Sequence, residues 1–137
     1  MILNKTIAID LAKYGGDGYI EVGYPSFRKQ KMADQAASSL LVKFENGRQI
    51  PTVDRMIDAD ITRMLAFIES APFDATSVES FYEFTDSLDR KQRGSGEALY
   101  EEIKDAIERI KSGEQSPSPS SPEAENGSSG SVSSQIS

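Results

Sequence analysis

The hydrophobic pattern of this chain is clearest between residues 54 and 73. Apolar side chains recur there at every third or fourth position, with charged residues between them, at Ile57, Ile61, Met64, Leu65 and Ile68. This spacing places them on one side of an α-helix. Pro72 limits the helix at its carboxyl end, because a proline cannot continue the helical hydrogen bonds. We therefore predict a central helix over residues 54–73, packed in the middle of a helical core.

Two stretches near the amino terminus alternate with the period of a β-strand. In residues 6–12 and 19–24, the apolar residues of one face are Ile7, Ile9 and Leu11, then Ile20, Val22 and Tyr24. The segment between them is rich in glycine and suits a turn, so we predict a β-hairpin. Pro25 has no N–H group for a strand ladder and is expected to end the second strand.

The segment between this hairpin and the central helix admits two interpretations. Ser26 is a good N-cap residue, and an apolar stripe follows it at Met32, Ala36, Leu40, Leu41 and Phe44. Asn46-Gly47 then suits the end of a helix. Alternatively, residues 41–44 and 48–52 are short strands joined by Asn46-Gly47, which is a strong hairpin signal. We favour the helix, because the residues after the turn, Arg-Gln-Ile-Pro, make a poor strand.

Two more helices are predicted in the second half of the chain. Thr76 and Glu79 have the spacing of a capping box, and the helix that follows carries Val78, Phe81, Tyr82, Phe84 and Leu88. Gly94-Ser95-Gly96 interrupts the pattern. The last helix is expected over residues 97–111, with an apolar stripe at Leu99, Ile103, Ile107 and Ile110.

These elements predict the fold class and the domain boundary. An isolated hairpin is only marginally stable in water, so its apolar face must pack on the helices. The predicted fold is α+β, an N-terminal β-hairpin packed on three or four α-helices in a single small domain over residues 1–112. Residues 113–137 are mostly Ser, Pro, Gly and Glu. Such a segment buries too little apolar surface to offset its ordering entropy, so we predict a disordered C-terminal tail.

Charge and composition disfavour several classes of function. The formal net charge is −7, and the tail holds three Glu and no Lys or Arg, which leaves −4 on residues 1–112. Nucleic-acid binding is disfavoured, because its affinity comes mainly from Lys and Arg that contact phosphates. The chain has no Cys and no His, so it lacks the thiolate nucleophile, the commonest general base and the commonest metal ligand. We therefore expect no enzymatic activity.

The expected location follows from the absence of long apolar runs. No run in the sequence approaches the ~20 residues that a membrane span needs. The first residues also lack the apolar region of a signal peptide. We expect no membrane association and a cytoplasmic location.

Two motifs resemble ligand sites but lack the required residues. Gly15-Gly16-Asp17-Gly18 leads into a strand and lacks the lysine of a phosphate-binding loop. Asp54, Asp58 and Asp60 lack the spacing and the central glycine of a calcium loop, and acids are favoured near the start of a helix by its dipole. We therefore assign no catalytic, cofactor-binding or metal-binding residues.

Four segments of the chain resemble a known protein family. They are residues 18–27 (GYIEVGYPSF), 28–32 (RKQKM), 66–73 (AFIESAPF) and 81–89 (FYEFTDSLD). Together with the β-containing start, the terminal pair of helices and the low-complexity tail, they resemble tail assembly chaperones of long-tailed bacteriophages over roughly residues 15–112. The resemblance implies a non-enzymatic protein that binds the tape-measure protein, keeps it soluble and recruits tail-tube subunits, and that is absent from the finished virion.

Four aromatic residues are the candidate contacts for such a partner. Tyr24 and Phe27 lie at the predicted junction between the hairpin and the next helix, Phe73 follows an Ala-Pro step, and Tyr82 is expected at the edge of a core stripe. Exposed aromatic side chains beside apolar surface are typical anchors of protein interfaces. Two alternative functions stay open on the sequence, a structural tail or capsid component and a small acidic adaptor or regulatory protein. The sequence does not specify the oligomeric state.

Overall fold

The structure is a computed structural model, and it describes residues 5–113. The predicted tail therefore lies outside the described residues, apart from Gly113. The elements follow in the order β1 (Thr6–Asp10), the 3-10 helix η1 (Leu11–Tyr14), β2 (Tyr19–Gly23), α1 (Phe27–Ser39), β3 (Val42–Glu45), β4 (Arg48–Pro51), α2 (Met56–Leu65), β5 (Ile68–Ser70), α3 (Val78–Lys91) and α4 (Ser95–Lys111). The predicted α+β class is confirmed, with an N-terminal hairpin followed by four α-helices in this range.

The N-terminal hairpin is confirmed and supplies two strands of the main sheet. β1 and β2 pair antiparallel, with Ile9 opposite Ile20 and both side chains buried. The chain reverses through η1, at whose start the Asp10 carboxylate accepts a hydrogen bond from the Ala12 N–H at 2.9 Å. A third strand, β5, pairs antiparallel with the other edge of β2, so the strand order is β1-β2-β5.

The predicted central helix is correct in its first half and wrong in its second. α2 stops short of Ile68, which lies on β5 with a side chain only 2% exposed. All residues from 64 to 68 are buried, and one face of a surface helix cannot bury five consecutive residues. A turn into a strand buries them, and the Gly23 N–H holds this turn by donating to the Phe67 carbonyl at 2.8 Å. Ile57, also predicted in the core, is 61% exposed.

The segment between α1 and α2 contains a second β-hairpin. The favoured interpretation, one helix reaching Phe44, is wrong, and the alternative of two short strands is correct. The predicted cap is present, since the Ser26 hydroxyl accepts a hydrogen bond from the Lys29 N–H at 3.2 Å. α1 ends at Ser39, and the later turn between β3 and β4 contains Asn46 with a φ of 53° and Gly47 with a φ of 76°. Two successive left-handed residues form the tight turn that joins adjacent antiparallel strands.

The last two helices are present, with small differences at their starts. The N-cap of α3 is Ser77, whose hydroxyl accepts a backbone N–H at 3.1 Å, rather than the predicted Thr76. Thr76 instead donates its hydroxyl to Asp74. α4 begins at Ser95, directly after Gly94, whose φ of 85° reverses the chain. The predicted apolar stripe of α4 is buried, at Leu99, Ile103, Ile107 and Ile110.

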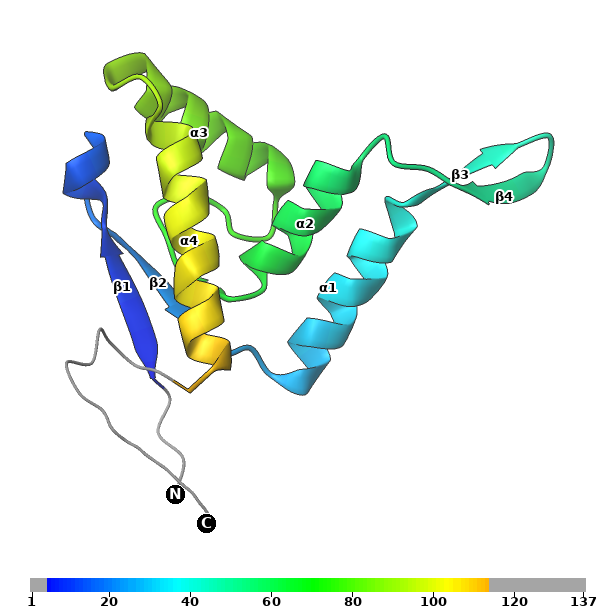
Figure 1. The fold of residues 1–137 in the computed structure, drawn as a ribbon, viewed down its shortest axis with the longest axis horizontal. Helices are drawn as coiled ribbons and strands as arrows, with labels where there is room; N and C mark the ends of the chain where they lie inside the picture. The colour runs from blue at the N-terminus through cyan, green and yellow to red at the C-terminus, as the bar shows by residue number, and fades with distance from the viewer. Residues whose placement is uncertain (1–4, 114–137) are drawn as a thin grey trace, which may run out of the picture.

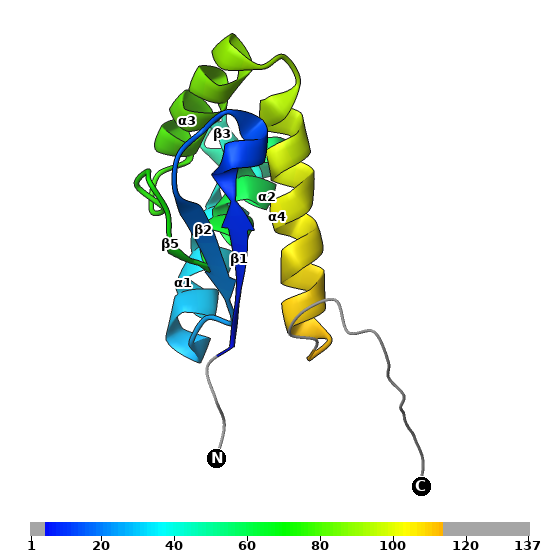
Figure 2. The same cartoon turned by 90° about the vertical axis from the view of Figure 1, so that its left-hand side faces the viewer.

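The helices cover one side of the sheet and then extend away from it. α4 packs against β1 and β2, and α3 runs beside α4 (Figure 1). Figure 2 shows the strands of the N-terminal hairpin with α4 alongside them. α2 packs on α3 and α4 on one side and on α1 on the other. Residues 42–51, which we name the hairpin arm, project away from the body beyond α1 and α2 (Figure 1).

Candidate functional site

Three helices enclose an open groove of about 360 Å³, which we name the α2–α3–α4 groove. Gly96 allows α4 to approach α3 closely at its start, because an added Cβ atom would lie 3.0 Å from side-chain atoms of Thr85 and Asp89. The lining residues of the groove are Ile57, Ile61, Phe81, Tyr82, Thr85, Asp89, Gly96, Glu97 and Tyr100.

The groove has an apolar floor and one exposed apolar side chain. Phe81 and Ile61 are buried members of the main core and line the bottom of the groove. Ile57 lies one helical turn before Ile61 on the same face of α2, where it extends beyond the core. A large aliphatic side chain that adjoins an apolar groove enlarges the apolar surface in contact with water, which is a property of binding sites.

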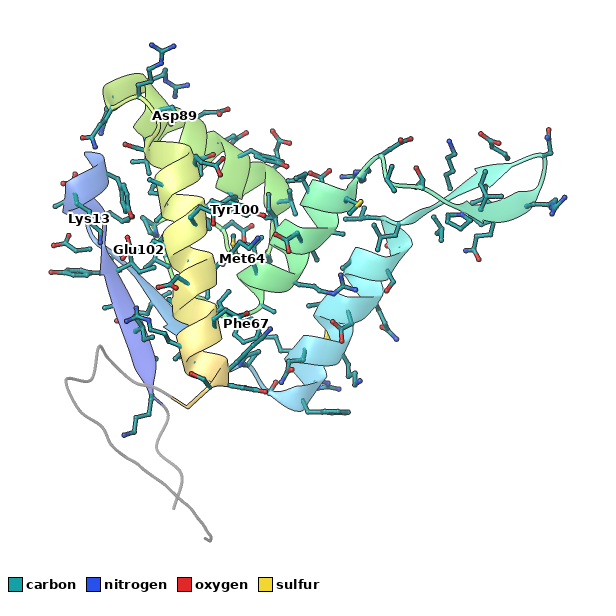
Figure 3. The ribbon with its side chains drawn as sticks, in the orientation of Figure 1. Lys13, Met64, Phe67, Asp89, Tyr100 and Glu102 are labelled. Carbon is teal, nitrogen blue, oxygen red and sulfur yellow. The ribbon has the colours of Figure 1, made fainter. Side chains whose placement is uncertain are left out.

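Two tyrosine–aspartate pairs connect the walls of the groove. The Tyr82 hydroxyl on α3 donates to the Asp58 carboxylate on α2 at 2.7 Å. The Tyr100 hydroxyl on α4 donates to Asp60, also on α2, and Tyr100 lies between α4 and α2 (Figure 3). Each carboxylate also has a basic partner, Arg55 at 2.8 Å from Asp58 and Lys104 at 3.3 Å from Asp60. These contacts hold three helices around the groove.

These contacts also shift the pKa values of the groups involved. Burial, together with the hydrogen bond to the Asp58 carboxylate, raises the pKa of Tyr82 to about 12. The pKa of Asp58 is lowered by its hydrogen bonds from Tyr82 and Arg55. Burial and the bond to Asp60 raise the pKa of Tyr100. At neutral pH the hydroxyls therefore stay protonated, and they act as hydrogen-bond donors between helices rather than as acid–base groups.

The end of the groove at the α3–α4 turn is acidic. One oxygen of Asp89 accepts a hydrogen bond from the Gly96 N–H at 2.8 Å, at the start of α4 (Figure 3). Glu97 lies in the first turn of the same helix and lines the groove. Within residues 5–113, neither carboxylate forms an ion pair with a lysine or arginine. These two carboxylates are therefore the charged groups in the lining of the groove.

The structure does not gather the four predicted contact residues into one site. Tyr82 lines the groove. Phe73 is half-buried and packs against the core, with its ring centroid 5.6 Å from that of Phe81 and 5.0 Å from that of Phe84. Tyr24 and Phe27 are exposed at the β2–α1 junction, outside the groove lining. A contact role for any of the four stays a prediction.

Sequence reasoning missed most of the groove. Ile57 was assigned to the core because its spacing matches the buried residues of α2, and spacing cannot show that a helix extends past its neighbours. Tyr100 and Glu97 lie on α4 outside its apolar stripe and carry no motif. The pairing of Tyr82 with Asp58, 24 positions earlier in the chain, depends on the packing of α3 on α2, which no local pattern encodes.

The acids considered as metal ligands have other partners in the structure. Asp58 and Asp60 bind a tyrosine and a basic side chain each, as described above. Asp54 is exposed, 4.0 Å from Lys43. Within the described part of the chain, no three acidic side chains converge as a metal-ligand set.

Comparison of the chain with protein-family models, with curated proteins and with solved structures finds no match. Among residues 5–113, no helix combines the length and the apolar character that crossing a membrane requires.

Proposed function

We propose that this protein is a non-enzymatic tail assembly chaperone, which binds a helical segment of the tape-measure protein in the α2–α3–α4 groove and brings tail-tube subunits to it. The observation that carries the proposal is the groove, in which the exposed side chain of Ile57 adjoins a buried apolar floor. The sequence resemblance supplies the identity of the partner.

The apolar lining of the groove suits an amphipathic helix as the bound segment. An amphipathic helix binds by placing apolar side chains one turn apart into such a groove. The floor offers Ile61 and Phe81 as apolar contacts, and Ile57 provides a further contact at the rim. Covering this surface removes apolar area from water, which stabilises a complex. A chaperone that covers the apolar faces of a long helical protein in this way keeps that protein soluble.

The charges of the groove define the partner helix further. Asp89 and Glu97 line the end of the groove at the α3–α4 turn. Opposite charges across an interface steer association and fix the register of the bound segment. The bound segment is therefore expected to carry lysine or arginine next to its apolar residues.

The chemistry of the groove favours binding over catalysis. Its tyrosine hydroxyls are engaged by Asp58 and Asp60, and those carboxylates are engaged by Arg55 and Lys104. A general base or nucleophile needs a group that is held close to a substrate atom and is able to exchange a proton. The tyrosine hydroxyls that line this groove are instead committed to holding the three helices together.

The test is co-expression of the full chain with a tape-measure protein, followed by capture on a tag. We expect a soluble complex. Ile57→Asp places a charge in the apolar contact and should reduce the captured tape-measure protein by about tenfold or more. Met56→Asp is the matched control, because Met56 is similarly exposed on the adjacent position but lies outside the groove lining.

A second pair of variants tests the acidic end of the groove. Glu97→Lys should weaken the complex, whereas Glu83→Lys, an equal charge change on an exposed residue outside the lining, should not. Equal capture by Ile57→Asp, Glu97→Lys and both controls would exclude the groove as the binding site. A tape-measure protein that stays insoluble with the chain present would exclude the chaperone function.

Mass spectrometry of purified virions separates the chaperone from a structural tail or capsid component. A structural component must be present in the particle in stoichiometric amounts, whereas a chaperone is expected to be absent. Detection of the chain in stoichiometric amounts would replace the proposal with the structural alternative.

A further inference from the structure

The hairpin arm carries apolar surface that the described part of its own chain leaves uncovered. β3 and β4 pair with each other and form a separate two-stranded sheet. Phe44 on this arm is 73% exposed, and Val53, just after it, is 72% exposed. A two-stranded hairpin without further packing is marginally stable in water. The arm would therefore be stabilised by a partner that extends its sheet and covers Phe44.

The strand register divides the arm into two faces of different character. Val42 lies opposite Pro51, and Phe44 lies opposite Gln49. Because alternate residues of a strand share a face and opposite residues point to the same side, Val42, Phe44, Gln49 and Pro51 share one face, which is apolar apart from Gln49. The other face carries Lys43, Glu45, Ile50 and Arg48.

The two outer edges of the arm differ in their capacity to pair with another strand. The edge of β4 contains Pro51, which has no N–H to donate, and prolines of this kind block pairing. The edge of β3 contains no proline. Its four residues also include one lysine and one glutamate, whereas Arg48 is the single charged residue of β4.

The backbone of β3 is oriented for pairing at this edge. The Thr52 N–H donates to the Leu41 carbonyl at 2.8 Å, which makes these two residues a hydrogen-bonded pair. Hydrogen-bonded and non-hydrogen-bonded pairs alternate along an antiparallel ladder. Lys43 therefore turns its backbone groups toward β4, and Val42 and Phe44 turn theirs outward.

We propose that two copies of this chain associate through the outer edges of their β3 strands, which join antiparallel about a twofold axis at Phe44. The two arms then form one four-stranded sheet. In this register Phe44 of each copy lies opposite Phe44 of the other. Lys43 of each copy lies opposite Glu45 of the other, at the non-hydrogen-bonded positions where side chains approach most closely.

Charge complementarity selects a second copy as the occupant of this edge. A twofold interface must be complementary to itself. The Lys-Phe-Glu sequence of residues 43–45 meets this condition, because antiparallel pairing about Phe44 places the lysine of each copy opposite the glutamate of the other. Within one copy Lys43 already lies 3.5 Å from Glu45, so dimerisation produces alternating charges across two adjacent strands. Opposite-charge and aromatic pairs across strands stabilise a sheet.

The test is sedimentation equilibrium of the full chain over a range of concentrations, with charge-exchange variants of the arm. We expect a monomer–dimer equilibrium for the natural chain. Lys43→Glu places two glutamates opposite two glutamates, and Glu45→Lys places lysines opposite lysines. Each variant alone should have a dimer dissociation constant raised by about tenfold or more. An equimolar mixture of the two should restore dimers, because the charges are again complementary.

The mixture separates a lost interface from a damaged arm, since an unfolded arm could not be rescued. Gln49→Glu is the control, because it changes the charge of β4 away from the proposed edge and should leave the dimer unchanged. A natural chain that is monomeric at every concentration, or a mixture that fails to form dimers, would overturn the proposal. So would dimers that both charge variants leave intact.

The self-association is independent of the proposed chaperone function. The groove variant Ile57→Asp should dimerise like the natural chain, because Ile57 lies on α2 and outside the arm. A variant that loses tape-measure binding but still dimerises would therefore test only the role of the groove. A variant that loses dimers but still binds would test only the role of the arm.

Discussion

The Tyr82 hydroxyl on α3 donates a hydrogen bond to the Asp58 carboxylate on α2 at 2.7 Å. The same carboxylate accepts a second bond from Arg55 at 2.8 Å. Three residues from two helices thus form one network at the edge of the α2–α3–α4 groove. The network fixes the position of α2 relative to α3, and through it the width of the groove.

Removal of the Tyr82 hydroxyl should destabilise the fold. We expect Tyr82→Phe to lower the free energy of unfolding by about 1 kcal/mol, since the ring still packs while Asp58 loses one donor. Urea denaturation followed by circular dichroism measures the change. Tyr19→Phe is the control, because Tyr19 is exposed and should change stability by less than about 0.5 kcal/mol. Equal effects of the two variants would contradict a role for the hydrogen bond.

The same pair predicts a loss of stability at alkaline pH. The folded pKa of Tyr82 is about 12 and its reference value is 10.0, so the folded state holds this proton more tightly than the unfolded chain. The resulting contribution to stability is complete below pH 10 and is lost as the pH rises through the folded pKa. The pKa of Tyr100 is also raised, so this residue contributes to stability in the same pH range.

Denaturation at a series of alkaline pH values measures this effect. The free energy of unfolding should fall between the reference and folded pKa values, and Tyr82→Phe should make that fall shallower. An ultraviolet titration of tyrosinate should show Tyr82 ionising later than a free tyrosine. The same alkaline slope in both proteins would show that Tyr82 does not titrate differently in the two states.

Ile68 and Ile57 should respond oppositely to truncation, although the sequence places both in one stripe. Ile68→Ala removes a buried side chain from β5 and should cost about 2–5 kcal/mol of unfolding free energy. Ile57→Ala changes a side chain that is 61% exposed, and should cost less than about 0.5 kcal/mol. Chemical denaturation of both variants makes the comparison. Similar losses would mean that residues 56–68 form one continuous helix after all.

The turn of the hairpin arm should be sensitive to a side chain at Gly47. Its φ of 76° is unfavourable for residues with a Cβ atom. We expect Gly47→Val to destabilise the arm by about 1–2 kcal/mol while the main core keeps its melting temperature. Amide hydrogen exchange measured residue by residue distinguishes the two regions.

Gln49→Ala, an exposed substitution elsewhere on the arm, serves as the control for that experiment. Faster exchange of arm amides should appear in Gly47→Val and not in Gln49→Ala. If Gly47→Val instead lowered the stability of the whole domain, the arm would be part of the cooperative core.

The sequence specified the elements that depend on local pattern. Alternation at Ile7, Ile9 and Ile20 indicated the N-terminal hairpin, and the four-residue spacing from Leu99 indicated the last helix. Both signals are strong because each element buries one complete face. Apolar residues then recur with the period of that element, every second position in a strand and every third or fourth in a helix.

The errors arose where two local signals competed or where the outcome depended on a distant partner. Asn46-Gly47 fits both a helix end and a hairpin turn. Residues 43–49 are exposed, so they bury no apolar face whose period would distinguish a helix from a strand. Ile68 lies on a strand rather than on the predicted helix because it pairs with the edge of β2, which lies over forty positions earlier in the chain. The groove was missed for the same reason, since its walls come from three separate helices.

The division of the core has a consequence for how the chain opens. The main apolar cluster takes its residues from 7–22 and 61–110, and the single buried residue of α1 is Ala37. The stretch from Gly23 to the start of α2 therefore contributes no residue to this cluster. The chain segments on either side of the stretch are joined by the hydrogen bond that the Gly23 N–H donates to the Phe67 carbonyl at 2.8 Å. We expect a segment attached in this way to unfold as its own cooperative unit, at a free energy below that of global unfolding. Residues 23–55 should then be able to unfold and refold while the sheet and the last two helices stay folded.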